Sequence, residues 1–183
     1  NGTDYTTTVA ANGSWTLNVD GADLAALAEG HAVITATVSD KAGNTSSATH
    51  NLLVDTLAPT ITISTVAGDD VINSTEHTQA QVISGTTTNA IAGDQVTVTV
   101  GSNTYTTLVN ADGSWSVGVP ASVIGALADG TATITATVTD KAGNSSDASH
   151  DVMVNTAAPT LTIATIAGDD IINAIELGQP LVI

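Results

Sequence analysis

Acidic side chains in this sequence gather in turns rather than along its apolar runs. The segment Asp140-Lys141-Ala142-Gly143-Asn144 has an identical copy at residues 40–44. Another loop places four oxygen-bearing side chains within eight residues, namely Asp69, Asp70, Asn73 and Glu76. Such groups repel one another unless they are solvated, hydrogen-bonded or bound to a cation. The chemistry that these residue types and spacings suit is therefore the binding of a hard cation through oxygen.

These loops recur because the chain contains an internal repeat. Trp15 and Trp115 stand in the same Gly-Ser-Trp phrase, 100 residues apart in the numbering. Residues 1–83 align with residues 101–183 without a gap, and roughly half of the paired positions are identical. A period of this length is typical of tandem domains rather than of solenoid turns.

Charge and composition narrow the possible partners. The chain has 18 Asp and Glu residues against 2 Lys and Arg, which gives a formal net charge of −16. Nucleic acids and anionic membrane surfaces both require clustered basic residues, so neither is expected as a partner. The sequence has no cysteine and no apolar run long enough for membrane insertion. The acidity itself leaves two readings open, simple solubility and the binding of divalent cations.

The apolar residues alternate with polar ones, which predicts an all-β fold. In the run from Ala132 to Thr139, even positions are apolar and odd positions are Thr, the pattern of a strand with one buried face. Short helical turns are expected only at residues 22–28 and 122–128. Seven strands with turn signals between them fit immunoglobulin-like β-sandwich modules in tandem, each of about 100 residues. The predicted strands of one module lie near residues 60–65, 80–88, 95–102, 103–109, 114–120, 131–139 and 146–154.

A proline marks the expected module boundary, since proline cannot donate into a central strand ladder. Pro59 and Pro159 follow equivalent linkers. Residues 1–56 are then the C-terminal part of one module, residues 57–156 a complete module, and residues 157–183 the N-terminal part of the next. The linkers are short, so consecutive modules should touch and form an extended rod. The chain begins and stops inside a repeat, which suggests a segment of a longer protein.

One predicted cation site lies where two modules meet. In such a sandwich the last interstrand loop returns to the N-terminal pole, where the first strand begins. Asp140 and Asn144 stand in that loop, Asp55 lies in the preceding linker, and Asn89 and Asp94 precede the strand at 95–102. Main-chain carbonyls of the loop add oxygen ligands, and a flexible oxygen-rich loop favours Ca²⁺ over Mg²⁺. The alternative is a hairpin turn in which Asp140 caps backbone amides.

A second predicted cation site lies at the opposite pole. Asp69, Asp70, Asn73 and Glu76 form its loop, and Asp129 approaches from a neighbouring loop. The spacing is not that of an EF-hand. The alternative is a solvated acidic loop that caps the end of a strand.

The remaining candidate residues favour structural roles. Trp115, Val117 and Val119 occupy alternate positions and therefore lie on the same face of the predicted strand. We assign Trp115 to the core, with Tyr105 packed nearby. His150 shares its parity with Val152 and is expected to be a satisfied strand histidine. No arrangement typical of a catalytic triad or a phosphate-binding loop is present, so an enzyme is not expected.

Several motifs in order resemble the bacterial immunoglobulin-like repeats of giant, type I-secreted, biofilm-associated adhesins. The resemblance covers the whole chain, and it rests on the segments at residues 140–144, 54–60, 67–76, 112–115 and 127–130. It implies a cell-surface or biofilm-matrix location and a stalk of many modules stiffened by Ca²⁺ at the junctions. It supports Asp55, Asp140 and Asn144 at one junction. Asn155 replaces the acid of Asp55, which should weaken the next junction.

The resulting hypothesis is a structural segment of an extracellular adhesin or matrix fibre. Its partners would be neighbouring modules of the same chain and other copies within a fibre, while its receptor is unknown. The alternative is a module that binds glycan or protein through loops at one pole. That alternative requires an exposed aromatic residue or an apolar patch, and the sequence shows no clear sign of either.

Overall fold

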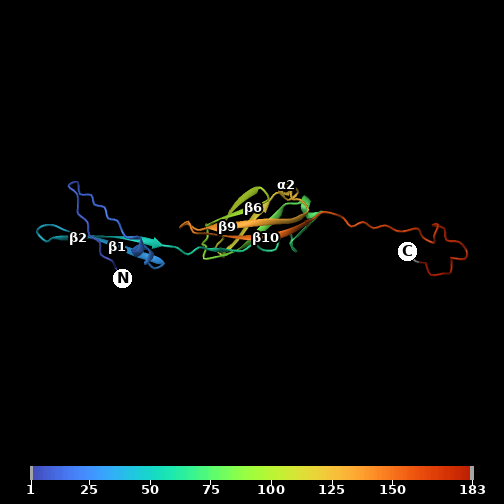
Figure 1. Cartoon of the computed structure of the whole chain (residues 1–183), viewed down its shortest axis with the longest axis horizontal. Helices are drawn as coiled ribbons and strands as arrows, with labels where there is room; N and C mark the ends of the chain where they lie inside the picture. Colours follow the sequence, from blue (N-terminus) through green and yellow to red (C-terminus); the bar gives the residue numbers. More distant parts are fainter. Residues whose placement is uncertain (1, 182–183) are drawn as a thin grey trace.

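A computed structural model describes residues 2–181. Figure 1 shows three successive parts along the longest axis: an N-terminal part, a central β-sandwich and a C-terminal segment. The N-terminal part contains α1 (Gly21–Ala25) and one antiparallel pair, β1 (Gly30–Ser39) and β2 (Thr45–Val54). Residues 156–181 contain turns but no helix or strand. None of the helices in the described residues is long and apolar enough to cross a membrane.

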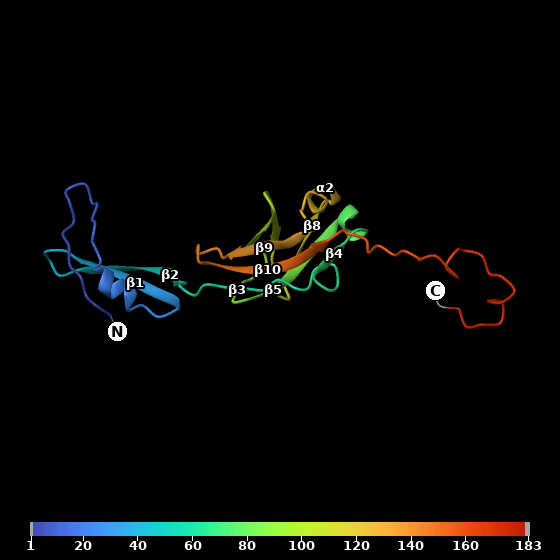
Figure 2. The ribbon, with the colours of Figure 1, turned by 45° about the vertical axis from the view of Figure 1, so that its right-hand side comes forward.

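The central sandwich has two sheets (Figure 2). The five-stranded sheet has the order β4-β10-β9-β6-β7, formed by Val71–Asn73, Ser145–Asn155, Gly130–Thr139, Gln95–Val100 and Asn103–Leu108. The three-stranded sheet has the order β3-β5-β8, formed by Thr60–Ile61, Gln81–Thr88 and Ser114–Val119. One-turn helices η1 (Glu76–Thr78) and α2 (Ala121–Ile124) lie in the connections. The all-β, immunoglobulin-like prediction is confirmed.

The structure contains one strand that the periodicity did not indicate. β4 is only three residues long and pairs in parallel with β10, with Ile72 opposite Val154. It lies inside the segment that was expected to be an acidic loop. Three residues are too few to show a period of two, so the apolar pair Val71-Ile72 was its only sequence signal. Positive φ angles at Ala67 and Asp70 form the turn that leads into this strand.

Valine and isoleucine from both sheets fill the core around one tryptophan. Trp115 is 1% exposed, and Tyr105 is partly buried against the same core, as their parity predicted. The inward faces of β6 and β9 supply much of the rest, namely Val96, Val98, Val100, Ile134, Ala136 and Val138. Trp15, the equivalent residue of the N-terminal part, is 51% exposed.

A glycine on β5 leaves room for the close approach of the Thr62 main chain and the Trp115 side chain. A Cβ atom on Gly85 would overlap the carbonyl oxygen of Thr62 and lie 2.8 Å from Cζ2 of Trp115. We expect Gly85→Ala to lower the free energy of unfolding by about 1–3 kcal/mol, because the backbone must move to admit the methyl group. Urea denaturation followed by tryptophan fluorescence measures this change.

Gly118→Ala on β8 is the matched control, since nothing lies within 4 Å of a Cβ atom built there. Alanine should leave stability unchanged or raise it by up to about 1 kcal/mol. Equal destabilisation by the two substitutions would contradict the packing role of Gly85.

Candidate functional site

The loop between β9 and β10 is a tight turn closed by its own polar residues. The main-chain N–H of Asp140 donates to the carbonyl of Asn144 at 3.0 Å. In return, the N–H of Asn144 donates to Oδ1 of Asp140 at 2.8 Å, and Nδ2 of Asn144 donates to Oδ2 at 2.9 Å. The side-chain hydrogen bond from Asn144, followed by the main-chain bonds of the turn, lowers the pKa of Asp140. Asp140 is therefore held as a carboxylate.

The same loop is joined to the linker that enters the module. Nδ2 of Asn144 also donates to the main-chain carbonyl of Asp55 at 3.2 Å. Oγ of Ser146 donates to the carbonyl of Pro59 at 2.5 Å. These bonds place the β9–β10 loop at the pole where the module begins, in agreement with the strand-order argument.

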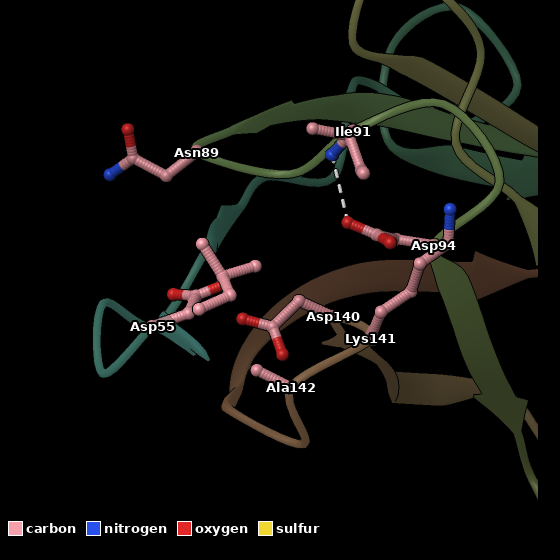
Figure 3. A pocket seen from close by; sticks show the side chains of 8 residues that line it. Asp55, Asn89, Ile91, Asp94, Asp140, Lys141 and Ala142 are labelled. Carbon is pink, nitrogen blue, oxygen red and sulfur yellow. Dashed lines mark hydrogen bonds between the residues drawn. The ribbon is translucent and has the colours of Figure 1, made fainter. Parts of the chain in front are cut away.

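A cleft of about 480 Å³ lies at this junction. Its lining comes from β2, the linker, the β5–β6 loop and the β9–β10 loop, through Leu53, Asp55, Asn89, Ile91, Asp94, Asp140, Lys141 and Ala142. Figure 3 shows the carboxylates of Asp55, Asp94 and Asp140 arising from three different segments around it. The structure thus brings together the residues predicted for this pole, with Asn144 bonded to two of them.

Asp94 is the unusual member of this group, because it is only 2% exposed. Its Oδ2 accepts a hydrogen bond from the N–H of Ile91 at 2.8 Å, which closes the loop before β6. Its Oδ1 is buried and has no hydrogen-bond partner among the described residues. A buried carboxylate oxygen without a partner is costly unless another positive or donor group compensates it.

The residues at this cleft suit a calcium ion in type, although their side chains do not form a closed cage. Within residues 2–181, no group of three or more His, Asp or Glu side chains has metal-binding spacing. Asp94, with its one unpartnered oxygen, nevertheless lines the same cleft as Asp55 and Asp140. Calcium accepts six to eight oxygens in flexible geometry, and carboxylates such as these are its usual ligands.

At the opposite pole, the predicted side chains are engaged in local hydrogen bonds. Oδ1 of Asp69 accepts from the N–H of Val71 at 3.0 Å. Asn73 and Glu76 cap each other: Oδ1 of Asn73 accepts from the N–H of Glu76 at 3.1 Å, and Oε2 of Glu76 accepts from the N–H of Asn73 at 3.1 Å. This is a capping-box arrangement. The cation assignment at this pole stays a prediction.

Asp129 lies at this pole too, but it contacts the outgoing linker. Its Oδ1 accepts from the N–H of Thr156 at 3.0 Å and from its hydroxyl at 2.8 Å. Glu29 accepts in the same way from Thr56 in the first copy. The repeated contact anchors the start of each linker to the end of its own module.

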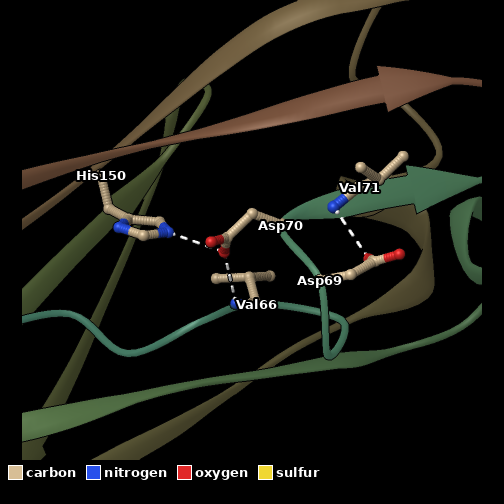
Figure 4. Close-up of polar contacts among 5 residues, drawn as sticks. All are labelled: Val66, Asp69, Asp70, Val71 and His150. Carbon is tan, nitrogen blue, oxygen red and sulfur yellow. Dashed lines mark hydrogen bonds and ion pairs between the residues drawn. The ribbon is translucent and has the colours of Figure 1, made fainter.

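Asp70 makes the one ion pair found in the described part of the chain. Its Oδ1 lies 2.7 Å from Nε2 of His150 on β10 and also accepts from the N–H of Val66 at 2.8 Å (Figure 4). The hydrogen bond with His150 and then that from Val66 lower the pKa of Asp70. His150 is therefore a satisfied strand histidine, as its parity predicted.

The junction cleft has three contributors that were not identified in the sequence, namely Leu53, Ile91 and the side chain of Lys141. Leu53 forms an apolar wall, and the side chain of Lys141 lines the cleft, whereas only its main-chain carbonyl had been considered. A signal for Lys141 was available, since the only two basic residues of the chain occupy the same place in the two copies of the turn.

The β-sandwich and the internal repeat indicate tandem immunoglobulin-like domains. The family model described as the bacterial Ig-like domain matches residues 1–56 and 58–156, and the chain belongs to this family. A search among curated proteins finds no match.

Solved structures narrow the comparison further. The chain is 39% identical to a Ca²⁺-stabilized adhesin with which an Antarctic bacterium binds ice, over 93% of this chain and 43% of that one, with a TM-score of 0.52. It is 33% identical to a 1.5-MDa bacterial ice-binding adhesin, over 93% of this chain and 56% of that one, with a TM-score of 0.53. The chain thus spans about half the length of either solved chain.

The Asp70–His150 pair predicts how the free energy of unfolding changes with pH in the acidic range. A carboxyl whose pKa is lowered on folding contributes stability above its unfolded value of about 3.9, and this contribution is lost as pH falls through the lower folded value. The stability difference between the wild type and Asp70→Asn should therefore be constant near pH 5 and shrink towards pH 2. Urea midpoints measured across this range in chelator test it.

Asparagine tolerates the positive φ of 63° at position 70, so the substitution leaves the turn intact. Asp147→Asn, on the exposed face of β10, removes the same charge away from His150. A difference between wild type and Asp70→Asn that did not vary with pH would exclude the charged contact as its source.

Proposed function

We propose that this chain is a structural segment of an extracellular bacterial adhesin or biofilm-matrix fibre. Residues 57–156 form one module of the stalk, residues 1–56 belong to the module before it, and residues 157–183 begin the next. Membership of the bacterial Ig-like domain family and the likeness to two adhesins support this role. The linear succession of parts in Figure 1 fits a rod.

The observation that carries the proposal is the buried, unpartnered oxygen of Asp94 at a cleft lined from both modules. Within a single module this oxygen has no stabilising partner. Asp55 of the linker and Asp140 of the β9–β10 loop line the same cleft, where a calcium ion would offset two of the three negative charges. The site then links the preceding module to the complete one.

The stabilisation expected from one such site is modest. Calcium sites in extracellular modules have dissociation constants of about 10⁻⁴–10⁻³ M. At 10 mM free calcium, mass action gives about 1.4–2.7 kcal/mol per site when only the folded state binds. In a stalk of many modules, the same gain recurs at each junction and limits bending there.

The partners in this proposal are neighbouring modules and other copies in a fibre, at the cell surface or in the matrix. Type I secretion is implied by the resemblance to giant adhesins. Because the chain has no cysteine, the stalk would be stabilised by its core and cations rather than by disulfides. The role is mechanical and requires no catalytic residue. The glycan-binding alternative gains no support from Trp115 of the complete module, because it is buried.

Calorimetric melting of the chain with 10 mM calcium or with chelator tests the proposal. The midpoint temperature of the main unfolding transition of the wild type should be several degrees higher in calcium than in chelator. For a domain of this size, each kcal/mol of added stability raises that temperature by about 4–8 °C. Asp94→Asn should abolish that rise. In chelator it should melt close to the wild-type temperature, because the amide keeps the acceptor for the N–H of Ile91 while it removes the buried charge.

Asp147→Asn is again the matched control, because it removes one carboxylate from the exposed face of β10 and should keep the full calcium response. Melting temperatures of the wild type that are equal in calcium and chelator would remove the cation from the proposal. A full response in Asp94→Asn would place the site elsewhere.

A further inference from the structure

The two basic side chains of this chain hold equivalent positions. The sequence contains 2 Lys and Arg residues against 18 Asp and Glu, and these two are Lys41 and Lys141 of the repeated turn. Lys141 lines the junction cleft together with Asp55, Asp94 and Asp140. In a chain with a net charge of −16, one of the two lysines lies at a cleft lined by three carboxylates, which points to an electrostatic role for that lysine.

The turn itself does not require a lysine at this place. Hydrogen bonds between residues 140 and 144 close it, and the positive φ of 95° at Gly143 lets the chain reverse. The Lys141 side chain is exposed and makes no ion pair within the described residues, since the one such pair joins Asp70 and His150. Its ammonium is therefore available to move on a flexible four-carbon stem.

The cleft also offers this ammonium a partner. Oδ1 of Asp94 is buried without a hydrogen-bond partner, and Asp94 and Lys141 both line the cleft (Figure 3). An ammonium group supplies three donors and one positive charge, which meet the need of an unpaired carboxylate oxygen. It satisfies one carboxylate, however, whereas the cleft has three, and it cannot bridge the linker to both loops as a divalent ion does.

We propose that Lys141 is a tethered counter-ion that occupies the acidic cleft in the absence of calcium and competes with calcium for it. This inference rests on the proposed calcium site and concerns its regulation. The lysine stabilises the cation-free junction, and the divalent ion must displace the ammonium to bind. The affinity for calcium is therefore lower than the three carboxylates would give without the lysine. The junction is then stiffened by calcium only where the calcium concentration is high.

The test replaces the charge while keeping the length of the side chain. Calcium titration calorimetry of Lys141→Met should show affinity about three- to tenfold higher than that of the wild type, the effect of removing one partly screened charge. In chelator the same variant should melt at a lower temperature, and added NaCl should restore more of its stability than it does for the wild type. Lys141→Arg should behave like the wild type.

Lys41→Met is the matched control, because it removes the same charge from the same turn at a place where residues 2–181 contain no preceding linker or junction cleft. It should change neither calcium affinity nor the melting temperature in chelator. If the wild type binds no calcium, the proposed function fails. If the wild type binds calcium but Lys141→Met binds with equal or lower affinity, the counter-ion role is overturned and the calcium junction stands.

Discussion

A carboxylate that is withdrawn from water and only half hydrogen-bonded is unstable on its own, and Asp94 is such a group. One of its oxygens holds the loop before β6 through the N–H of Ile91, which fixes the side chain where it is. The other oxygen has no hydrogen-bond partner among residues 2–181. The cost is recovered only if something outside the module, or a mobile part of it, brings positive charge to the cleft.

The short linker determines where that charge must be bound. Asp55 reaches the cleft because its carbonyl is held by Asn144 and because Pro59, four residues later, is bonded to Ser146. The linker is therefore held at the start of the sandwich, where Asp55 lines the cleft. The sequence repeats these linker residues 100 positions later, except that Asn155 stands in place of Asp55 and brings an uncharged amide there.

Much of this arrangement could be predicted from the sequence, for physical reasons. Alternating Val, Ile and Thr gave strands close to those observed, and strand order alone placed Asp140, Asp55 and Asp94 at one pole. The short strand β4 escaped prediction because three residues carry no period. The partners of individual oxygens also escaped it, since the contact between Asp70 and His150 spans 80 residues of sequence.

The two poles differ in how their oxygens are satisfied, and this difference gives the module a direction. At the C-terminal pole, Asp69, Asn73 and Glu76 accept main-chain N–H groups, so their loop is held by the chain itself. At the N-terminal pole, Asp94 retains a free acceptor and Lys141 a free donor. A rod needs rigid modules and a joint that responds to its surroundings. The same residue types thus close a loop through main-chain hydrogen bonds at one pole and, through Asp94, leave one oxygen without a partner at the other.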